Sequence, residues 1–392
     1  MKRILLQGST GSIGKSALLV IAEQKEHFCV VGLSAGHKES ELLDQARLLK
    51  PESVALLRPK DSAAFKSRAQ ALGIRKIFFG GDAFQRQTED TEYDVLLNAV
   101  MGSAGVRPTL SALSKGINVA LANKETLVAA GEIVMKCAQD HGAKILPIDS
   151  EHSALQQCLI GERNTDVRKY WLTTSGGPFW GKTERELANV TPREALAHPT
   201  WAMGPKITID SATLFNKGLE VIEACRLFGV SVGQVDVVRQ RESVIHSMIE
   251  FVDGSFKAQL SRPDMRLPIL YALTYPERNP SNLVKSHPAT LGTLHFDEVD
   301  RSSYPCLRMA YEAIEDGGTT PAVLSAADEV AVQAFLDEEI GFVKISDVIQ
   351  RTIDKVKQRD ASDLETIMEA DAEARQTARE IIRLHSGAKA TC

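Results

Sequence analysis

The chain has 392 residues, of which 43% are hydrophobic and 25% are charged, as is ordinary for a globular protein of two or three domains. Its formal net charge of −5 excludes the overall basic field that recruits nucleic acid or an anionic membrane surface. No run of about 18 apolar residues occurs, and no signal sequence precedes the first strand, which predicts a cytoplasmic protein without membrane spans.

The cysteines lie far apart in the sequence, and none belongs to a Cys-x-x-Cys pair. We therefore expect neither a zinc site nor a disulfide framework, and we interpret the thiols as reduced. They are Cys29, Cys137, Cys158, Cys225, Cys306 and Cys392.

The first predicted βα unit contains a glycine-rich turn. Residues 3–7 form a short apolar strand and residues 16–22 have a helical pattern, with Gly8, Gly11 and Gly14 between them. Glycines allow close approach of the backbone, and N–H groups at the start of a helix can hold a pyrophosphate. The spacing is GxxGxxG rather than the commoner GxGxxG, so it predicts a dinucleotide site, with a plain βα turn as the alternative.

The second predicted strand, residues 29–34, lacks an acidic residue at its end. Such an acid would bind the ribose 2′-hydroxyl of NAD. Here Gly36, His37 and Lys38 follow instead, a small and then basic stretch that fits the 2′-phosphate of NADPH. The alternative is a solvated loop.

Further strands are predicted at residues 53–57, 76–79, 94–99, 117–122 and 143–148, alternating with helices. This alternation predicts a doubly wound parallel sheet, in which ligands bind at the carboxyl ends of the strands. The last two strands end in Asn123-Lys124-Glu125 and Asp149-Ser150-Glu151, so both motifs lie at that edge.

Asp149 and Glu151 are close enough in sequence to repel each other unless a cation or proton neutralises them. Oxygen ligands in this position suit Mg²⁺ or Mn²⁺. The alternative is a helix N-terminus capped by Asp149 or Ser150. Lys124 either steadies developing negative charge or forms a salt bridge to an acid.

The second half of the chain contains residues that can donate hydrogen bonds to a phosphate. The turn 175–179 follows a strand at 169–174 and is rich in hydroxyl and backbone donors, and Ser211, Asn216 and Lys217 follow later. Residues 198–206 hold two prolines and exposed-looking Trp201 and Met203, which predicts a mobile lid or else an ordered loop. Glu220 is either a solvated helix residue or a third metal ligand.

The rest of the chain is interpreted as scaffold. Strands at 236–239 and 243–252, with a hairpin to 256–260, have an apolar face that suits a dimer interface. Residues 276–288 have the composition of a linker. Helices are predicted at 304–314, 321–336, 345–357 and 371–384, with a capping box from Ser362 to Glu365.

Taken together, these motifs resemble the 1-deoxy-D-xylulose 5-phosphate reductoisomerase family over nearly the whole chain. The glycine turn occurs in many folds, whereas the acid motif combined with the run from Asn216 to Glu220 is specific. The resemblance is carried by residues 8–14, 122–125, 149–152, 175–179, 203–204, 210–213, 216–220 and 263–266.

The resemblance implies NADPH and Mg²⁺ or Mn²⁺ as cofactors, with Co²⁺ as a further candidate. It implies that Asp149, Glu151 and Glu220 are the metal ligands and, together with Lys124, the catalytic residues. The implied substrate site comprises Lys124, Ser150, Glu151, Ser175, His198, Trp201, Ser211, Asn216, Lys217, Glu220 and Met265. The implied NADPH site comprises Gly8, Thr10, Gly11, Ser12, Ile13, Gly36, His37, Lys38, Asn123, Glu125 and Gly204.

The implied architecture is an α/β protein with a Rossmann-like NADPH domain (1–148) and a central α+β catalytic and dimerisation domain (149–275) with a flap at 198–206. A linker (276–300) and a C-terminal helical bundle (301–392) follow. The resemblance also implies a homodimer, a ketose phosphate substrate and inhibition by phosphonohydroxamates of the fosmidomycin type, with no nucleic acid or membrane partner.

The chain departs from the family pattern in two places. Gln240-Arg241-Glu242 stands where the family has His-Pro-Gln or a near variant, and Ser325 and Asp328 stand where it commonly has asparagines. Two other functions compete with the resemblance. A generic NADPH dehydrogenase would not need three carboxylates, and a redox-sensing regulator would bind NADPH without turnover.

Overall fold

The computed structural model describes residues 1–197 and 203–389. The chain divides into two compact units. The first unit comprises Met1–Thr126, Val134–Ser153 and Asp264–Lys285, and the second comprises Leu127–Ile133, Ala154–Pro263 and the chain from Ser286 onward. Each unit is described by itself below.

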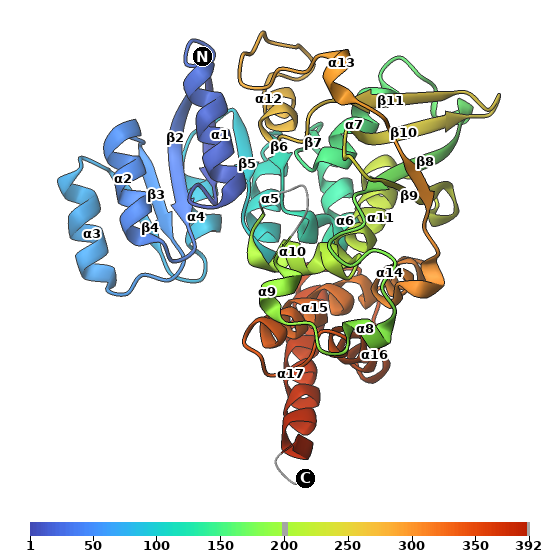
Figure 1. Cartoon of the computed structure of the whole chain (residues 1–392). Coiled ribbons are helices and arrows are strands. Elements are labelled where there is room, and N and C mark those ends of the chain that lie inside the picture. Colours follow the sequence, from blue (N-terminus) through green and yellow to red (C-terminus); the bar gives the residue numbers. More distant parts are fainter. Residues whose placement is uncertain (198–202, 390–392) are drawn as a thin grey trace. The chain divides into compact units, whose positions relative to one another are not determined.

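The first unit is built on a seven-stranded sheet in the order β4-β3-β2-β1-β5-β6-β7 (Figure 1). All neighbouring strands are parallel, which confirms the predicted doubly wound sheet. The order reverses at β1, between β2 and β5, so the topological switch point lies at its carboxyl end. The strands are β1 (Lys2–Gln7), β2 (Phe28–Ala35), β3 (Ser53–Leu56), β4 (Lys76–Phe79), β5 (Val95–Asn98), β6 (Asn118–Leu121) and β7 (Ile145–Pro147).

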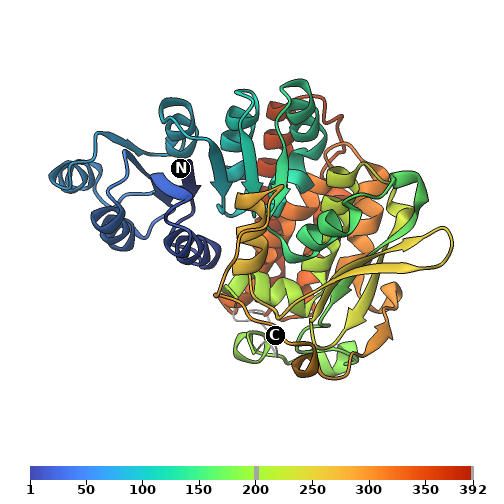
Figure 2. The same ribbon diagram turned by 90° about the horizontal axis from the view of Figure 1, so that it is seen from above.

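Helices cover both faces of this sheet (Figure 2). Leu42 and Phe65, from two helices, pack into the apolar cluster on one face, whereas Phe84 packs on Ala55 and Phe78 on the other. Because both faces are buried, the strands are almost continuously hydrophobic. The helices are α1 (Ser12–Glu23), α2 (Glu39–Leu49), α3 (Ser62–Ala71), α4 (Ala83–Asp90), α5 (Val106–Leu113) and α6 (Lys124–Asp140).

A later segment of the chain returns to the first unit. Helix α12 (Arg266–Thr274) contributes Ile269 and Leu273 to the core of the first unit, and Lys2 Nζ donates to the Leu273 carbonyl at 2.8 Å. The domains predicted from the sequence assign one part of this segment to the catalytic domain and the other part to a linker. The predicted domain boundaries stay a prediction, but residues 264–285 pack with the N-terminal sheet.

The second unit contains a five-stranded mixed sheet in the order β11-β10-β8-β9-β12. Its strands are β8 (Val167–Thr174), β9 (Val235–Gln240), β10 (Ile245–Phe251), β11 (Phe256–Leu260) and β12 (Phe296–Glu298). The β10–β11 hairpin confirms the predicted turn, with Gly254 at φ +85°. The predicted linker at 276–300 stays a prediction, and the short strand β12 within that range pairs with β9.

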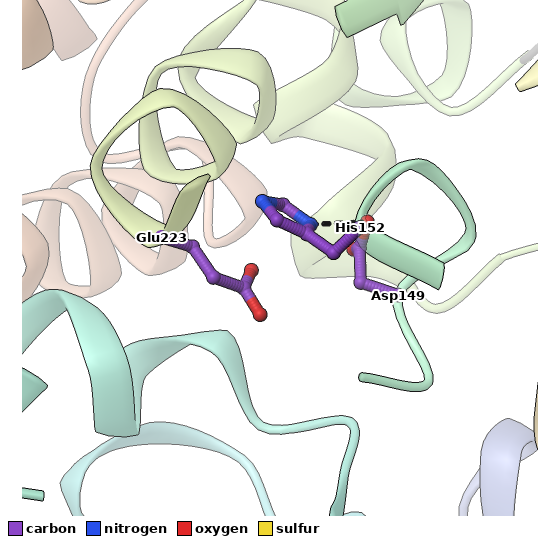
Figure 3. Close-up of side chains that lie close together, drawn as sticks. All are labelled: Asp149, His152 and Glu223. Carbon is purple, nitrogen blue, oxygen red and sulfur yellow. Dashed lines mark hydrogen bonds and ion pairs between the residues drawn. The ribbon is translucent and has the colours of Figure 1, made fainter. Parts of the chain in front are cut away.

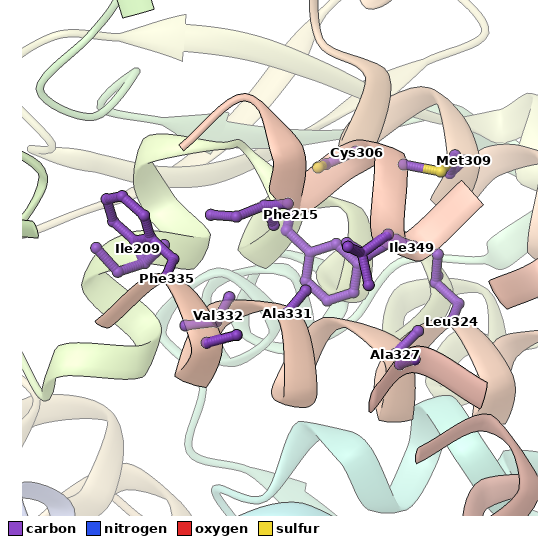
Figure 4. Packing of buried hydrophobic residues seen from close by; sticks show 14 of the residues in the cluster. Ile209, Phe215, Cys306, Met309, Leu324, Ala327, Ala331, Val332, Phe335 and Ile349 are labelled. Atoms are coloured by element: carbon purple, nitrogen blue, oxygen red, sulfur yellow. The ribbon is translucent and has the colours of Figure 1, made fainter. Parts of the chain in front are cut away.

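Helices pack on one face of this sheet and form the predicted bundle. Tyr170, Leu172 and Ile249 of the sheet share an apolar cluster with Leu155 of α7 and Val221 of α11. Phe215, Leu324, Phe335 and Ile349 meet in a second cluster (Figure 4). The helices are α7 (Ser150–Leu159), α8 (Glu184–Leu187), α9 (Pro192–Ala195), α10 (Pro205–Ala212), α11 (Phe215–Phe228), α13 (Pro288–Leu291), α14 (Pro305–Asp316), α15 (Thr320–Leu336), α16 (Lys344–Lys355) and α17 (Leu364–Lys389).

The predicted capping box at Ser362 is wrong. Asp363 is the residue whose side chain accepts the N–H of Thr366, at 2.9 Å, and α17 then runs on without a break. Aspartate and serine stabilise a helix N-terminus about equally well, and here Asp363 is the residue that caps α17. No helix among the described residues is both long and apolar enough to cross a membrane.

Candidate functional site

The turn between β1 and α1 brings backbone segments close together. Gly8 has φ +83°, and a Cβ there would lie 2.2 Å from the Ala99 carbonyl oxygen. A Cβ on Gly14 would lie 2.3 Å from the Gly8 carbonyl oxygen. Helix α1 begins at Ser12, and its N-cap, Gly11, has no side chain that could accept the first N–H groups of the helix. These N–H groups lie at the switch point, where a pyrophosphate can bind.

The segment after β2 carries the predicted 2′-phosphate residues. Lys38 Nζ lies 3.4 Å from the Thr10 carbonyl oxygen, which links this segment to the glycine turn. The backbone N–H of Arg58 donates to the Gly36 carbonyl at 2.8 Å. Arg58 is therefore a further basic residue whose backbone lies next to the segment of His37, and no sequence motif indicated it.

Asn123 and Glu125 organise the end of β6. Asn123 Oδ1 accepts the N–H of Thr126 at 3.0 Å, so Asn123 is the N-cap of α6. Asn123 Nδ2 donates to the Val100 carbonyl at 2.8 Å and to Glu125 Oε2 at 2.9 Å. These bonds fix the start of α6, and with it Lys124, at the carboxyl edge of the sheet.

Asp149 lies between two basic groups. Lys124 Nζ is 2.8 Å from Asp149 Oδ2. His152 Nδ1 is 3.0 Å from Asp149 Oδ1, and Figure 3 shows these two side chains together. Burial by itself would raise the pKa of Asp149, but Lys124 and His152 outweigh it and hold that pKa well below its ordinary value. The side chain is therefore an ionised carboxylate, the form that binds a cation.

Both interpretations of the acid motif describe this geometry. The Glu151 N–H lies 3.3 Å from Asp149 Oδ1, as at a helix N-terminus, and α7 begins at Ser150. Ser150 Oγ donates to Glu151 Oε2 at 2.6 Å. A capping position does not exclude a ligand role, because a carboxylate has lone pairs for a second partner. The salt bridge considered for Lys124 is present, with Asp149 as the acid.

In the second unit, the turn after β8 lies directly against the end of α10. Gly177 has φ +65°, and a Cβ there would lie 2.7 Å from the Ser211 carbonyl oxygen. Only glycine tolerates both this backbone conformation and this approach. The structure thus brings together the backbone of the Ser175 turn and the Ser211 region, two elements that the sequence analysis assigned to one phosphate.

The first turns of α11 carry a buried charge pair. Lys217 Nζ forms an ion pair with Glu220 Oε2, and the two side chains are 3% and 1% exposed. Asn216 Nδ2 donates to Glu220 Oε1 at 2.5 Å. Glu220 therefore points inward, which excludes a solvated helix residue, and its role as a third metal ligand stays a prediction. Glu223, drawn in Figure 3, lies one turn further along the same helix and is also buried.

Several predicted residues are less informative here. His198 and Trp201 lie outside the described residues, as does most of the predicted lid, so the lid stays a prediction. Gly204 is the N-cap of α10. Met265 is half-buried against the core of the first unit.

Arg239 of β9 is a further candidate site residue that no sequence motif indicated. Its Nε donates to the Ser175 carbonyl at 3.0 Å, and its Nη1 lies 2.9 Å from Asp297 Oδ2. The guanidinium stacks 4.5 Å from the ring centroid of Trp180. Strands β8 and β9 are parallel and pair Thr174 with Arg239, so both strands end at the same edge of the sheet. The position of Arg239 at the end of a predicted strand could therefore have indicated it.

The divergent stretch 240–242 forms a closed turn. Gln240 is fully buried, its Oε1 accepts the Val244 N–H at 2.8 Å, and its Nε2 donates to Glu242 Oε2 at 2.5 Å. His295 Nδ1 lies 2.7 Å from Glu242 Oε1. Gln240 and Glu242 therefore have structural roles in this turn that do not require a bound ligand.

Comparison with known proteins agrees with this geometry. Residues 4–131 match the family model for 1-deoxy-D-xylulose 5-phosphate reductoisomerase, residues 145–228 match the model for its C-terminal domain, and residues 260–377 match that for the DXP reductoisomerase C-terminal domain. Curated relatives of that name include one from Chlorobium phaeobacteroides, 46% identical over 97% of this chain and 99% of its own length. Another, from Listeria welshimeri, is 47% identical over 96% and 98%.

Solved structures are similar over the same extent. A DOX-P reductoisomerase crystallised with NADPH, fosmidomycin and magnesium has a TM-score of 0.92 and 38% identity, covering 98% of this chain and 99% of its own. The enzyme from Zymomonas mobilis in complex with NADPH has a TM-score of 0.89 and 37% identity, covering 97% and 99%. The chain described here belongs to the 1-deoxy-D-xylulose 5-phosphate reductoisomerase family.

Proposed function

We propose that this chain converts 1-deoxy-D-xylulose 5-phosphate to 2-C-methyl-D-erythritol 4-phosphate, using NADPH and a divalent metal ion. This reaction belongs to the non-mevalonate route to isoprenoid precursors. One observation carries the proposal beyond family membership. The chain holds an ionised Asp149 beside Lys124 and a buried Glu220 beside Lys217, which is the donor chemistry that a metal-bound phosphorylated ketose requires.

The metal ligands that we propose are Asp149, Glu151 and Glu220, which offer one carboxylate oxygen each. Three hard oxygen donors fit Mg²⁺ or Mn²⁺, with Co²⁺ as a further candidate. Asp149 and Glu151 stand at the start of α7, and Leu155 of that helix shares an apolar cluster with Val221, the neighbour of Glu220 on α11. When bound, the ion supplies Lewis acidity and a template for two substrate oxygens.

The residues of the glycine turn fit NADPH. Close backbone approach at Gly8 and Gly14 and an uncapped start of α1 suit a pyrophosphate. Basic residues after β2, with no acid at its end, suit the 2′-phosphate and disfavour NADH. The NADPH contacts that we propose are Gly8, Thr10, Gly11, Ser12, Ile13, Gly36, His37, Lys38, Asn123, Glu125 and Gly204.

The remaining polar residues orient the substrate. Ser175, Ser211, Asn216 and Lys217 hold its phosphate far from the reacting carbons, so that binding energy there positions the carbonyl and hydroxyl groups. Lys124 and Ser150 donate to the reacting oxygens, and Lys124 stabilises negative charge that develops on them. His198, Trp201 and Met265 complete the proposed substrate site, as the family resemblance implies.

We propose further that the protein is a cytoplasmic homodimer and that a phosphonohydroxamate inhibits it. The outer face of the five-stranded sheet supports the dimer, since half-exposed Trp171, Met248 and Ala258 pair across three strands there. Phe256 on the edge strand is 55% exposed. Such a face suits a contact between two copies.

One assay tests the function. Oxidation of NADPH is followed with 1-deoxy-D-xylulose 5-phosphate as substrate, with and without a metal chelator, and with NADH in place of NADPH. We expect turnover that requires Mg²⁺ or Mn²⁺ and strongly prefers NADPH. Turnover that resists chelation would instead favour a simple dehydrogenase, and absence of turnover with any ketose phosphate would contradict the proposal.

A further inference from the structure

Two buried carboxyl groups share one lysine where α10 meets α15. Lys206 Nζ lies 2.5 Å from Asp210 Oδ2 and 2.7 Å from Asp328 Oδ2. The Asp210 and Asp328 side chains are 3% and 0% exposed. One ammonium carries one positive charge against two carboxyl groups, so ionisation of both would place two negative charges around Lys206 in a buried position. We call Lys206, Asp210 and Asp328 the α10–α15 cluster.

Apart from Lys206, the charged groups that act on Asp328 within the described part of the chain are the acids Asp210 and Glu329. Asp328 Oδ1 has no hydrogen-bond partner among the described residues. The buried thiol of Cys306 on α14 is close enough for Asp328 to influence its ionisation (Figure 4 shows Cys306 in the core). The buried side chains of α16 are uncharged. On α15 itself Glu329 adds negative charge, and Arg375 of α17 pairs with Glu329 at 2.8 Å.

These surroundings favour the neutral form of Asp328. Desolvation is the main reason that the pKa of Asp328 lies well above its ordinary value, and the charge of Asp210 raises it further, while Lys206 opposes both. A raised pKa means that the folded state holds a proton that the unfolded chain has lost. Stability therefore falls as the pH rises from the ordinary aspartate pKa through the raised one.

Two residues of the cluster lie on the helix that carries Ser211, which we propose donates a hydrogen bond to the substrate phosphate. Lys206 and Asp210 are one turn apart on α10, and Ser211 follows Asp210 directly. The end of α10 is the surface against which the backbone at Gly177 packs. Asp328 lies on α15, whose neighbours Leu324 and Ala327 belong to the apolar core. The cluster thus ties a substrate-binding helix to a fixed one.

We propose that the α10–α15 cluster positions the phosphate subsite, and that ionisation of its second carboxyl group makes substrate affinity depend on pH. Asp328 is a positioning residue, since it acts on Ser211 through Lys206 and Asp210. With one proton on the carboxyl pair, Lys206 balances the remaining charge. Loss of that proton adds a buried negative charge beside a subsite for a phosphate dianion, which weakens substrate binding. This inference rests on the proposed function.

The first test compares the full-length protein with Asp328→Asn, a variant of the same shape that cannot ionise. Both are assayed with NADPH, Mg²⁺ and 1-deoxy-D-xylulose 5-phosphate between about pH 6 and 9. Ionisation of the substrate phosphate changes both proteins alike. We expect the KM of the wild type to rise by about threefold or more relative to that of Asp328→Asn as the pH rises, with a nearly constant ratio of kcat values.

A second test needs no turnover. Thermal unfolding of the wild type and Asp328→Asn is measured over the same pH range, with Asp337→Asn as a control, because Asp337 is an exposed acid just after α15. We expect the advantage in Tm of Asp328→Asn to grow with pH, and no such trend for Asp337→Asn. Lys206→Met should raise KM more than it lowers kcat, and Lys206→Arg should restore much of the loss.

The outcomes distinguish a failure of the proposed role of the α10–α15 cluster from a failure of the proposed function. Parallel pH profiles of KM for an active wild type and Asp328→Asn would overturn the inference while leaving the proposed function intact. A Tm difference independent of pH would show that Asp328 ionises normally and would also overturn it. Absence of turnover in the wild type would contradict the proposed function and, with it, the role of the cluster in substrate binding.

Discussion

At the scale of single residues, the site is a set of charged groups that already have partners. Asp149 is held by Lys124 and His152, and Glu220 by Lys217. Buried charges are tolerated only when they are paired, so each of these two carboxylates depends on its neighbouring basic group. Removing one partner should therefore affect both the chemistry and the partner left behind.

Glu151→Gln should nearly abolish turnover, by about a hundredfold or more, because an amide is a poor ligand for a hard divalent ion. NADPH should still bind, since the glycine turn is untouched. Steady-state rates and a fluorescence titration with NADPH check the two parts. Glu162→Gln is the matched control, since Glu162 is a surface acid paired with Lys257. Rates near those of the wild type in Glu151→Gln would remove the metal-ligand hypothesis.

Lys217→Ala should mainly raise KM, by about tenfold or more, because it removes a charge-assisted contact to the substrate phosphate. It also leaves Glu220 buried without its lysine, which we expect to lower stability by about 3 kcal/mol. KM, kcat and chemical denaturation are measured together. An unchanged KM would count against the phosphate role, whatever happens to stability.

At the scale of secondary-structure elements, turns rather than helices set the site geometry. The β1–α1 turn depends on Gly8 and Gly14, and the turn after β8 depends on Gly177, where a Cβ would meet backbone atoms that cannot move aside. Arg239 fixes that second turn by its bond to the Ser175 carbonyl. Helices α1, α10 and α11 then present their termini and side chains from these fixed points.

Gly14→Ala should weaken NADPH binding by about tenfold or more and lower the Tm, because its Cβ would lie 2.3 Å from the Gly8 carbonyl oxygen. Gly81→Ala is the control, as nothing lies within 4 Å of a Cβ there. Cofactor titration and thermal unfolding of both variants check this. Equal cofactor affinities in the two variants would show that the tight turn is not needed for the dinucleotide.

At the scale of the whole molecule, the chain combines two units with different rules of construction. A parallel sheet buried on both faces requires helical crossovers, whereas the mixed sheet of the second unit buries one face and leaves the other half-exposed. That half-exposed face is the one that we propose for contact with a second copy of the chain. Phe256 and Leu260 on the edge strand β11 are 55% and 43% exposed.

Met248→Lys should therefore shift the protein toward monomer, because it places a charge in the middle of the outer face of the five-stranded sheet. Light scattering after size-exclusion chromatography measures the oligomeric state over a range of concentrations. Lys66→Glu, an exposed substitution on α3, is the control. A monomeric wild type would refute the dimer, and an unaltered dimer of Met248→Lys would move the interface elsewhere.

The sequence by itself determined the parallel sheet, because alternating apolar strands and helices allow few other folds. It also determined the glycine turn, the edge of the sheet at which Asp149 lies, and the family. Asp149-Ser150-Glu151 could equally be a cap or a ligand pair, because local pattern does not report partners. Only tertiary structure showed that Lys124 and His152 hold Asp149 ionised.

Other features depended on contacts between distant parts of the chain. Glu220 was ambiguous in sequence because helical spacing does not say which side of α11 is buried, and its contact with Lys217 settled that. The return of residues 264–285 to the first unit and the link of Lys206 to Asp328, 122 residues away, leave no local pattern. Burial and charge balance are properties of the packed chain, so the tertiary structure alone decided them.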